Sequence, residues 1–109
     1  MEIFSRNSFV RAMNRANANP AVDLANVATR VRNVREAYGM ASGDFARSIG
    51  VDPSSYSKIE KGTKPLKMEM GVAVCEAYGV TLDYIYRGRL GDLPEKVLRH
   101  LQSTQRQAN

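Results

Sequence analysis

The chain has 109 residues, of which 43% are hydrophobic, and its 16 Lys and Arg against 11 Asp and Glu give a formal net charge of +5. This length predicts one domain with a modest core, and the positive charge favours an anionic partner. The sequence has no apolar run that could cross a bilayer and no signal-peptide layout at its start, and one Cys with one His supplies too few ligands for a Cys/His metal site. We therefore expect a soluble intracellular protein with no membrane segment and no cofactor.

The positive charge is concentrated in one part of the chain. Residues 27–67 hold eight Lys and Arg against four acidic residues, whereas residues 1–26 carry a net charge of +1 and residues 68–109 are neutral. Many basic proteins bind no nucleic acid, so the charge by itself leaves the nature of the partner open.

Residues 1–19 are rich in Asn and Arg and contain scattered apolar residues. They predict an N-terminal extension that is either a short helix starting near Ser8 or a flexible arm. As an arm, it would use Arg6, Arg11 and Arg15 to follow DNA phosphates.

A long amphipathic helix is predicted over residues 20–38. Asn19-Pro20 is a typical helix start, and Gly39 is a typical stop. The apolar residues of its predicted core face recur at steps of three and four. They are Leu24, Val27, Val31, Val34 and Tyr38.

Two short helices separated by a glycine follow. The first is predicted over residues 42–49, with Ser42 as its cap because Ala41 is a poor one. Its inward residues are Phe45, Ala46 and Ile49. Gly50 provides a sharp turn, and Val51 is expected to fill the corner.

The second short helix, predicted over residues 52–61, has a small, polar and basic outer face. Asp52 is its predicted cap, Pro53 occupies its first position, and Gly62 stops it. Tyr56 and Ile59 are expected to face the core. The residues left outside, with one lysine in the following loop, are Ser54, Ser55, Ser57, Lys58, Lys61 and Lys64.

This arrangement is typical of a helix-turn-helix that places its second helix in the DNA major groove. Short serines allow the backbone to approach DNA, and Lys58 can reach a guanine. Lys61, Lys64 and Lys67 flank the loop that follows, where they are well placed for phosphate contacts. Without the preceding helix and turn, an ordinary capped surface helix would be the favoured interpretation of residues 52–61.

Three more helices are predicted. Residues 67–78 place Met68, Val72, Cys75 and Tyr78 at helical spacing, with Gly71 either lowering stability or permitting close packing. Cys75 fits a small core residue.

Residues 81–86, capped by Thr81, are predicted to direct Leu82, Ile85 and Tyr86 inward. Residues 92–102 form the last predicted helix, followed by a frayed polar tail over 103–109. Its apolar stripe, which consists of Leu90, Leu93, Val97 and Leu101 with Leu98 beside them, either seals the core of the monomer or forms a dimer seam. His100 is expected to lie at the surface.

Residues 27–88 resemble the lambda-repressor-like, Cro/C1-type (XRE-family) helix-turn-helix domain. The residues that carry the resemblance are Val31-Arg32, Arg35-Glu36-Ala37-Tyr38-Gly39-Met40, Phe45-Ala46, Ile49-Gly50-Val51, Ser57-Lys58-Ile59-Glu60-Lys61-Gly62, Lys64-Pro65 and Ala77-Tyr78-Gly79-Val80-Thr81-Leu82-Asp83. The resemblance implies an all-α fold, a compact five-helix bundle. The helix-turn-helix domain would span 20–88, with the N-terminal extension over 1–19 and a C-terminal helix and tail over 89–109.

The resemblance also implies roles for single residues. Ser42 falls where the family often has a Gln that contacts a phosphate. The base-facing positions are Pro53, Ser54, Ser57 and Lys58, and the phosphate-contact positions are Lys61 and Lys64, while Glu60 matches a structural Glu. Because Ser42 is not Gln, Pro53 has no donor and the serines are short, base readout is expected to depend on Lys58, on water or on DNA shape.

The implied function is that of a sequence-specific transcriptional regulator, a repressor, that binds double-stranded DNA as a homodimer. The implied location is the bacterial cytoplasm, and the protein would be encoded by a bacterium or a phage. One alternative is an antitoxin of the same fold that binds a toxin and represses its own operon. Another is a protein-interaction bundle that no longer binds DNA, against which the lysine cluster argues. An enzyme is not expected, because the sequence shows no nucleophile–base pair, metal cluster or phosphate loop.

Overall fold

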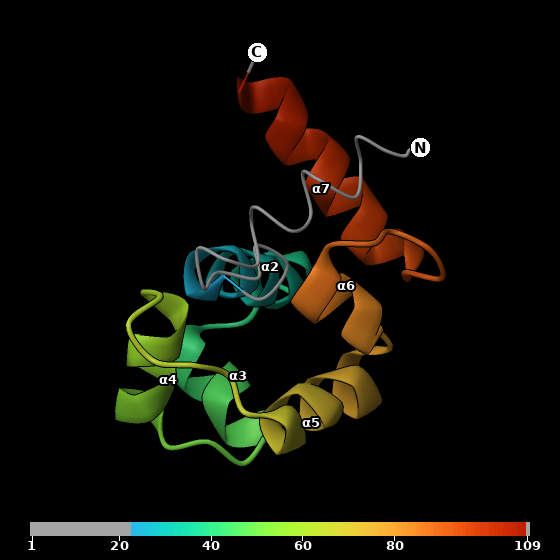
Figure 1. Ribbon diagram of the computed structural model, residues 1–109. Coiled ribbons are helices and arrows are strands. Elements are labelled where there is room, and N and C mark those ends of the chain that lie inside the picture. The colour runs from blue at the N-terminus through green and yellow to red at the C-terminus, as the bar shows by residue number, and fades with distance from the viewer. Residues whose placement is uncertain (1–22, 109) are drawn as a thin grey trace, which may run out of the picture.

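The computed structural model describes residues 23–108, and every regular element in this range is a helix. The helices are α2 (Leu24–Ala37), α3 (Ser42–Ser48), α4 (Pro53–Glu60), α5 (Met68–Tyr78), α6 (Leu82–Arg87) and α7 (Glu95–Ala108). Helices α2–α6 form the bundle, and α7 runs away from the end that holds α3 and α4 (Figure 1). The all-α prediction and the five-helix bundle are confirmed. The predicted extension over 1–19 lies outside the described residues.

Helix α2 is the element against which α4, α6 and α7 all pack. It begins at Leu24 rather than at Pro20 as predicted. Asp23 has extended backbone angles (φ −61°, ψ 129°), and its carboxylate accepts from the N–H of Ala25 at 2.7 Å, so Asp23 is the cap. Leu24 is 38% exposed and is not part of the buried face. The buried residues of α2 are Val27, Ala28, Val31 and Val34.

The turn between α3 and α4 follows the predicted scheme, with one correction. Ala41, not Ser42, occupies the N-cap of α3 and supplies no side-chain acceptor, so Ser42 is the first helical residue. Gly50 adopts a left-handed conformation (φ +74°) that a side chain would strain. Val51 is buried in the corner, as predicted.

The core joins the two short helices to the rest of the bundle. Phe45 of α3 and Tyr56 of α4 are fully buried, with ring centroids 5.4 Å apart. Phe45 also stacks on Tyr78 of α5 at 4.9 Å. Aromatic pairs at these separations add packing energy to their burial, so this cluster fixes the angle between α3 and α4.

The buried face of α5 differs from the prediction. Met68 is 58% exposed and Val72 is 37% exposed, while Gly71, Val74 and Tyr78 are buried. Cys75 is half-buried, and burial raises the pKa of its thiol. In α6, Ile85 is buried as predicted, but the second fully inward residue is Tyr84, with Leu82 and Tyr86 only partly buried. Thr81 caps α6 as predicted, because its hydroxyl accepts from the N–H of Tyr84 at 3.0 Å.

Helix α7 is longer than predicted. It continues to Ala108, so residues 103–108 are helical rather than frayed. Neither Gly nor Pro interrupts this stretch, and the Thr104 hydroxyl donates to the His100 carbonyl at 2.6 Å. Leu93 and Val97 are buried in the common core and Leu101 packs against it, so this part of the stripe seals the core of this chain, whereas Leu90 is 56% exposed. The dimer seam stays a prediction.

Polar contacts also hold α7 against α2. His100 Nε2 lies 3.2 Å from Glu36 Oε1, and the Lys96 ammonium lies 4.8 Å from the centre of the Tyr38 ring. None of the helices within residues 23–108 combines the length and apolarity needed to span a bilayer.

Candidate nucleic-acid interface

The first turn of α4 is held by a side-chain cap from Asp52. The Asp52 carboxylate accepts from the N–H of Ser54 at 3.1 Å, from the N–H of Ser55 at 3.3 Å, and from the Ser54 hydroxyl. The hydrogen bond from Ser54 is the main cause that lowers the pKa of Asp52, and the nearby charge of Lys64 contributes. Asp52 is therefore ionised at neutral pH, and it fixes the first turn of α4.

The predicted DNA-contact residues of α4 lie on the side opposite its two buried residues, Tyr56 and Ile59. The exposed members of this set are Pro53, Ser54, Ser57, Lys58 and Lys61. Ser55 is half-buried, as is Lys64 in the following loop. The helix thus presents one small, polar and basic face to solvent and one apolar face to the core.

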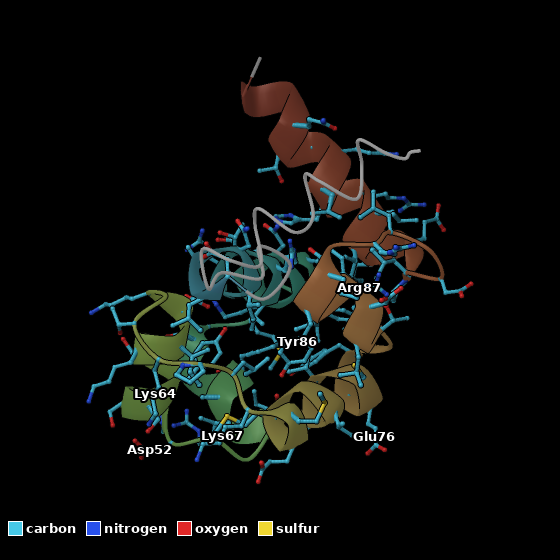
Figure 2. All side chains as sticks on the ribbon, in the orientation of Figure 1. Asp52, Lys64, Lys67, Glu76, Tyr86 and Arg87 are labelled. Carbon is cyan, nitrogen blue, oxygen red and sulfur yellow. The ribbon has the colours of Figure 1, made fainter. Side chains whose placement is uncertain are left out.

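The serines of this face are not equivalent. Ser54 uses its hydroxyl proton on Asp52, and Ser55 accepts a hydrogen bond from Lys64 Nζ at 3.2 Å. Ser57 is exposed, and its hydroxyl makes no hydrogen bond to any described residue. Figure 2 labels Asp52, Lys64 and Lys67 along the same side of the molecule, below and beside α4.

The start of α3 is a second part of the candidate interface. Ser42 is exposed there, and the first turn of α3 receives no side-chain cap from the described residues. Helix N–H groups without partners favour anions such as phosphate oxygens. Arg47 is exposed on the same helix and forms a 2.8 Å salt bridge with Asp44.

A half-buried ion pair links α4 to α2. Arg35 of α2 forms two hydrogen bonds with the Glu60 carboxylate, Nε–Oε2 at 2.8 Å and Nη2–Oε1 at 3.1 Å. The Tyr56 hydroxyl donates to Glu60 at 2.5 Å, and Arg35 also donates to the Met40 carbonyl at 2.9 Å. The Arg35 and Glu60 side chains are only 17% and 15% exposed.

Two side chains of this cluster, Arg35 and Tyr56, have raised pKa values because of their contacts and burial. The hydrogen bond to Glu60 raises the pKa of Arg35, and burial, followed by the hydrogen bond to Glu60, raises the pKa of Tyr56. The structural role that the resemblance implies for Glu60 agrees with this geometry. No signal in the sequence predicts Arg35 as the partner of Glu60, because the two residues lie 25 positions apart.

The described residues include no group of three or more His, Cys, Asp or Glu side chains that could hold a metal ion. The chemistry of this surface is that of hydrogen-bond donors and positive charges on short, rigid elements. Such groups recognise phosphates and base edges.

A short helix, a left-handed glycine turn and a second helix with a polar basic outer face, packed on a common core, define a helix-turn-helix protein. A family model described as helix-turn-helix, of the Cro/C1 type, matches residues 31–85, from the middle of α2 to α6. The match covers just over half of the chain, and the protein belongs to this family of DNA-binding helix-turn-helix regulators. No curated protein and no solved structure matches the chain.

Proposed function

We propose that the protein is a sequence-specific transcriptional regulator that inserts α4 into the major groove of double-stranded DNA. The observation that supports this most strongly is the outer face of α4. It combines a fixed N-terminal turn, small side chains and three surrounding lysines, Lys58, Lys61 and Lys64. A helix with small side chains at its start can approach base edges closely.

The proposed contacts of each residue depend on its position in the interface. Ser57 and Lys58 read base edges, and Pro53 offers an apolar contact to a thymine methyl. Ser42 at the start of α3, Lys61 at the end of α4 and Lys64 in the loop bind phosphates, and Ser55 orients Lys64. Ser54 donates its hydroxyl proton within the cap of α4, and the lone pairs of its oxygen accept from a base or a water.

The protein acts as a homodimer that represses transcription by occupying a roughly palindromic operator. One helix-turn-helix reads only a few base pairs, and a two-fold dimer would place two α4 helices about 34 Å apart, one turn of DNA. Sedimentation of the free and DNA-bound protein tests this assembly. A complex with one chain per duplex would contradict the dimer but leave DNA binding intact.

The function itself is tested by titrating labelled double-stranded DNA of mixed sequence at several salt concentrations, followed by selection of bound sites from a random pool. We expect binding that weakens steeply with salt, and enrichment of one motif with two-fold symmetry. If no salt-dependent binding appears, the proposed function is wrong.

A further inference from the structure

The loop between α4 and α5, residues 61–67, presents Lys64 and Lys67 on the side of the molecule that holds α4 (Figure 2). One part of this loop is tied to α4, because Lys64 Nζ donates to Ser55 at 3.2 Å. Thr63 is tied to the end of α4 as well, since both its N–H and its hydroxyl donate to the Lys58 carbonyl, at 3.0 and 3.1 Å.

The other end of the loop is held by a residue from α6. The Tyr86 hydroxyl donates to the Leu66 carbonyl at 2.7 Å, and the Lys67 carbonyl lies 3.1 Å from the same oxygen. Lys67 is the N-cap of α5, and its carbonyl also accepts the N–H of Gly71 at 3.0 Å. Tyr86 therefore contacts the backbone at the point where the loop becomes a helix.

Gly71 makes room for this contact. A Cβ atom at Gly71 would lie 2.7 Å from the Tyr86 oxygen and 2.9 Å from its Cε2 atom, which is closer than real contacts allow. Gly71 is helical, so the glycine is required by space and not by backbone conformation. The phenol of Tyr86 thus passes across the first turn of α5 to reach the loop.

Helix α6, which carries Tyr86, is itself fixed on α2. Arg30 of α2 donates to the Ile85 carbonyl at 3.1 Å, and its guanidinium packs against Gly88, where an added Cβ would lie 2.9 Å from Nη2. Tyr84 and Ile85 are buried in the core on the same helix. Tyr86 therefore reaches the loop from a rigid support.

We infer that Tyr86 is a positioning residue for DNA binding. Gly71 leaves space for the Tyr86 side chain, and the Tyr86 hydroxyl fixes the backbone of the loop that presents Lys64 and Lys67 to the phosphates. The inference rests on the proposed function. Ordering a loop and its lysines during binding costs entropy, and a loop that is already fixed avoids part of that cost. Phosphate contacts carry no sequence information, so the effect extends to DNA of any sequence.

The test compares two single-atom deletions on one helix. Tyr86→Phe removes the hydroxyl that holds the loop, while Tyr84→Phe removes a buried hydroxyl that has no hydrogen-bond partner among the described residues. Affinity is measured on labelled duplex DNA of mixed sequence, with the active fraction of each protein determined by stoichiometric titration. We expect Tyr86→Phe to weaken binding roughly three- to tenfold, the size of one net hydrogen bond, and Tyr84→Phe to leave it unchanged.

A double-mutant cycle separates positioning from a general structural role. In a Lys64→Ala/Lys67→Ala background, the lysines that Tyr86 positions are gone, so Tyr86→Phe should have no further effect on affinity. Equal affinities of Tyr86→Phe and Tyr84→Phe, or an undiminished effect in that background, would overturn the inference while the proposed function stands. Absence of DNA binding by the wild-type protein would overturn both.

Backbone order parameters of the loop give a readout that does not depend on the folding of any variant. In the free wild-type protein, the amides of Lys64 and Lys67 should show values close to those of α4 and α5, near 0.85. Values below about 0.6, typical of flexible backbone, would also overturn the inference.

Discussion

At the scale of single residues, the candidate interface contains two kinds of lysine. Lys58 is exposed on the outer face of α4 and makes no hydrogen bond to a described residue, whereas Lys64 is half-buried and donates to Ser55. An exposed side chain on the outer face of α4 suits base readout, and a side chain held in the loop that follows suits a phosphate.

These two lysines are expected to respond differently to substitution. Lys58→Ala should lower affinity for the selected site and relax its preferred sequence, at a cost of about 1–3 kcal/mol in discrimination. Lys64→Ala should weaken binding to all DNA and reduce the salt slope by about one unit. Titrations on the selected site and on mixed-sequence DNA check both, and loss of sequence preference in Lys64→Ala instead of Lys58→Ala would reverse the assignment.

At the scale of elements, α4 is fixed at both ends by carboxylates. Asp52 holds its first turn through backbone N–H groups, and Glu60 holds its last turn to α2 through Arg35. The helix has only eight residues, too few to be stable by itself in water, so these contacts and the buried Tyr56 and Ile59 determine its position.

The cap of α4 predicts a dependence of stability on pH. Hydrogen bonds from Ser54 and Ser55 lower the pKa of Asp52 in the folded protein. Its contribution is therefore complete above the ordinary carboxyl pKa and is lost as the pH falls through the lowered value. Unfolding curves across the acid range should show this loss in wild type and less of it in Asp52→Asn, since Asn also caps helices but does not titrate. Identical curves would show that the cap contributes nothing through its charge.

The ion pair between Arg35 and Glu60 predicts that substitution of Glu60 lowers stability strongly. Glu60→Ala leaves Arg35 and Tyr56 without their common partner, and we expect a loss of about 2–4 kcal/mol in the free energy of unfolding. Arg99→Ala breaks an exposed pair, with side chains 73% and 75% exposed, and should change stability by less than about 0.5 kcal/mol. Denaturant unfolding of both variants checks this, and equal losses would contradict it.

At the scale of the whole molecule, α7 is part of the same core as the helix-turn-helix. Val97 is fully buried and Leu93 is 8% exposed, both in the cluster that contains Phe45 and Tyr56. The matched family segment ends at residue 85, so α7 adds an extra layer over α2.

The core role of α7 is tested with two residues of the apolar stripe, Val97 within α7 and Leu90 before it. Val97→Ala should lower the free energy of unfolding by about 2 kcal/mol, because it removes fully buried methyl groups and leaves a cavity. Leu90→Ala, at a residue that is 56% exposed, should leave the stability of the monomer unchanged. Thermal unfolding measures the stability of both variants. If the stripe forms a dimer seam, Leu90→Ala should also weaken the dimer, which sedimentation measures. An unaffected Val97→Ala would mean that α7 does not stabilise the bundle.

The sequence by itself determined the helices, their order and the outer face of α4, because these depend on local signals: the spacing of apolar residues, Asp52-Pro53, and the glycines that end the helices. Local signals were less reliable where a helix has several apolar faces. In α5 the spacing favoured Met68 and Val72, but the packing against α6 buried Gly71 and Val74 instead.

Only the tertiary structure decided the pairings between distant residues. Arg35 meets Glu60 across 25 positions, and Tyr86 meets Leu66 across 20. No spacing rule predicts such pairs, because each depends on the angle at which two helices cross and on the space that a residue such as Gly71 leaves open. The sequence thus determined which helix carries the polar and basic outer face, whereas the packing of the helices decided how the loop that carries Lys64 and Lys67 is held.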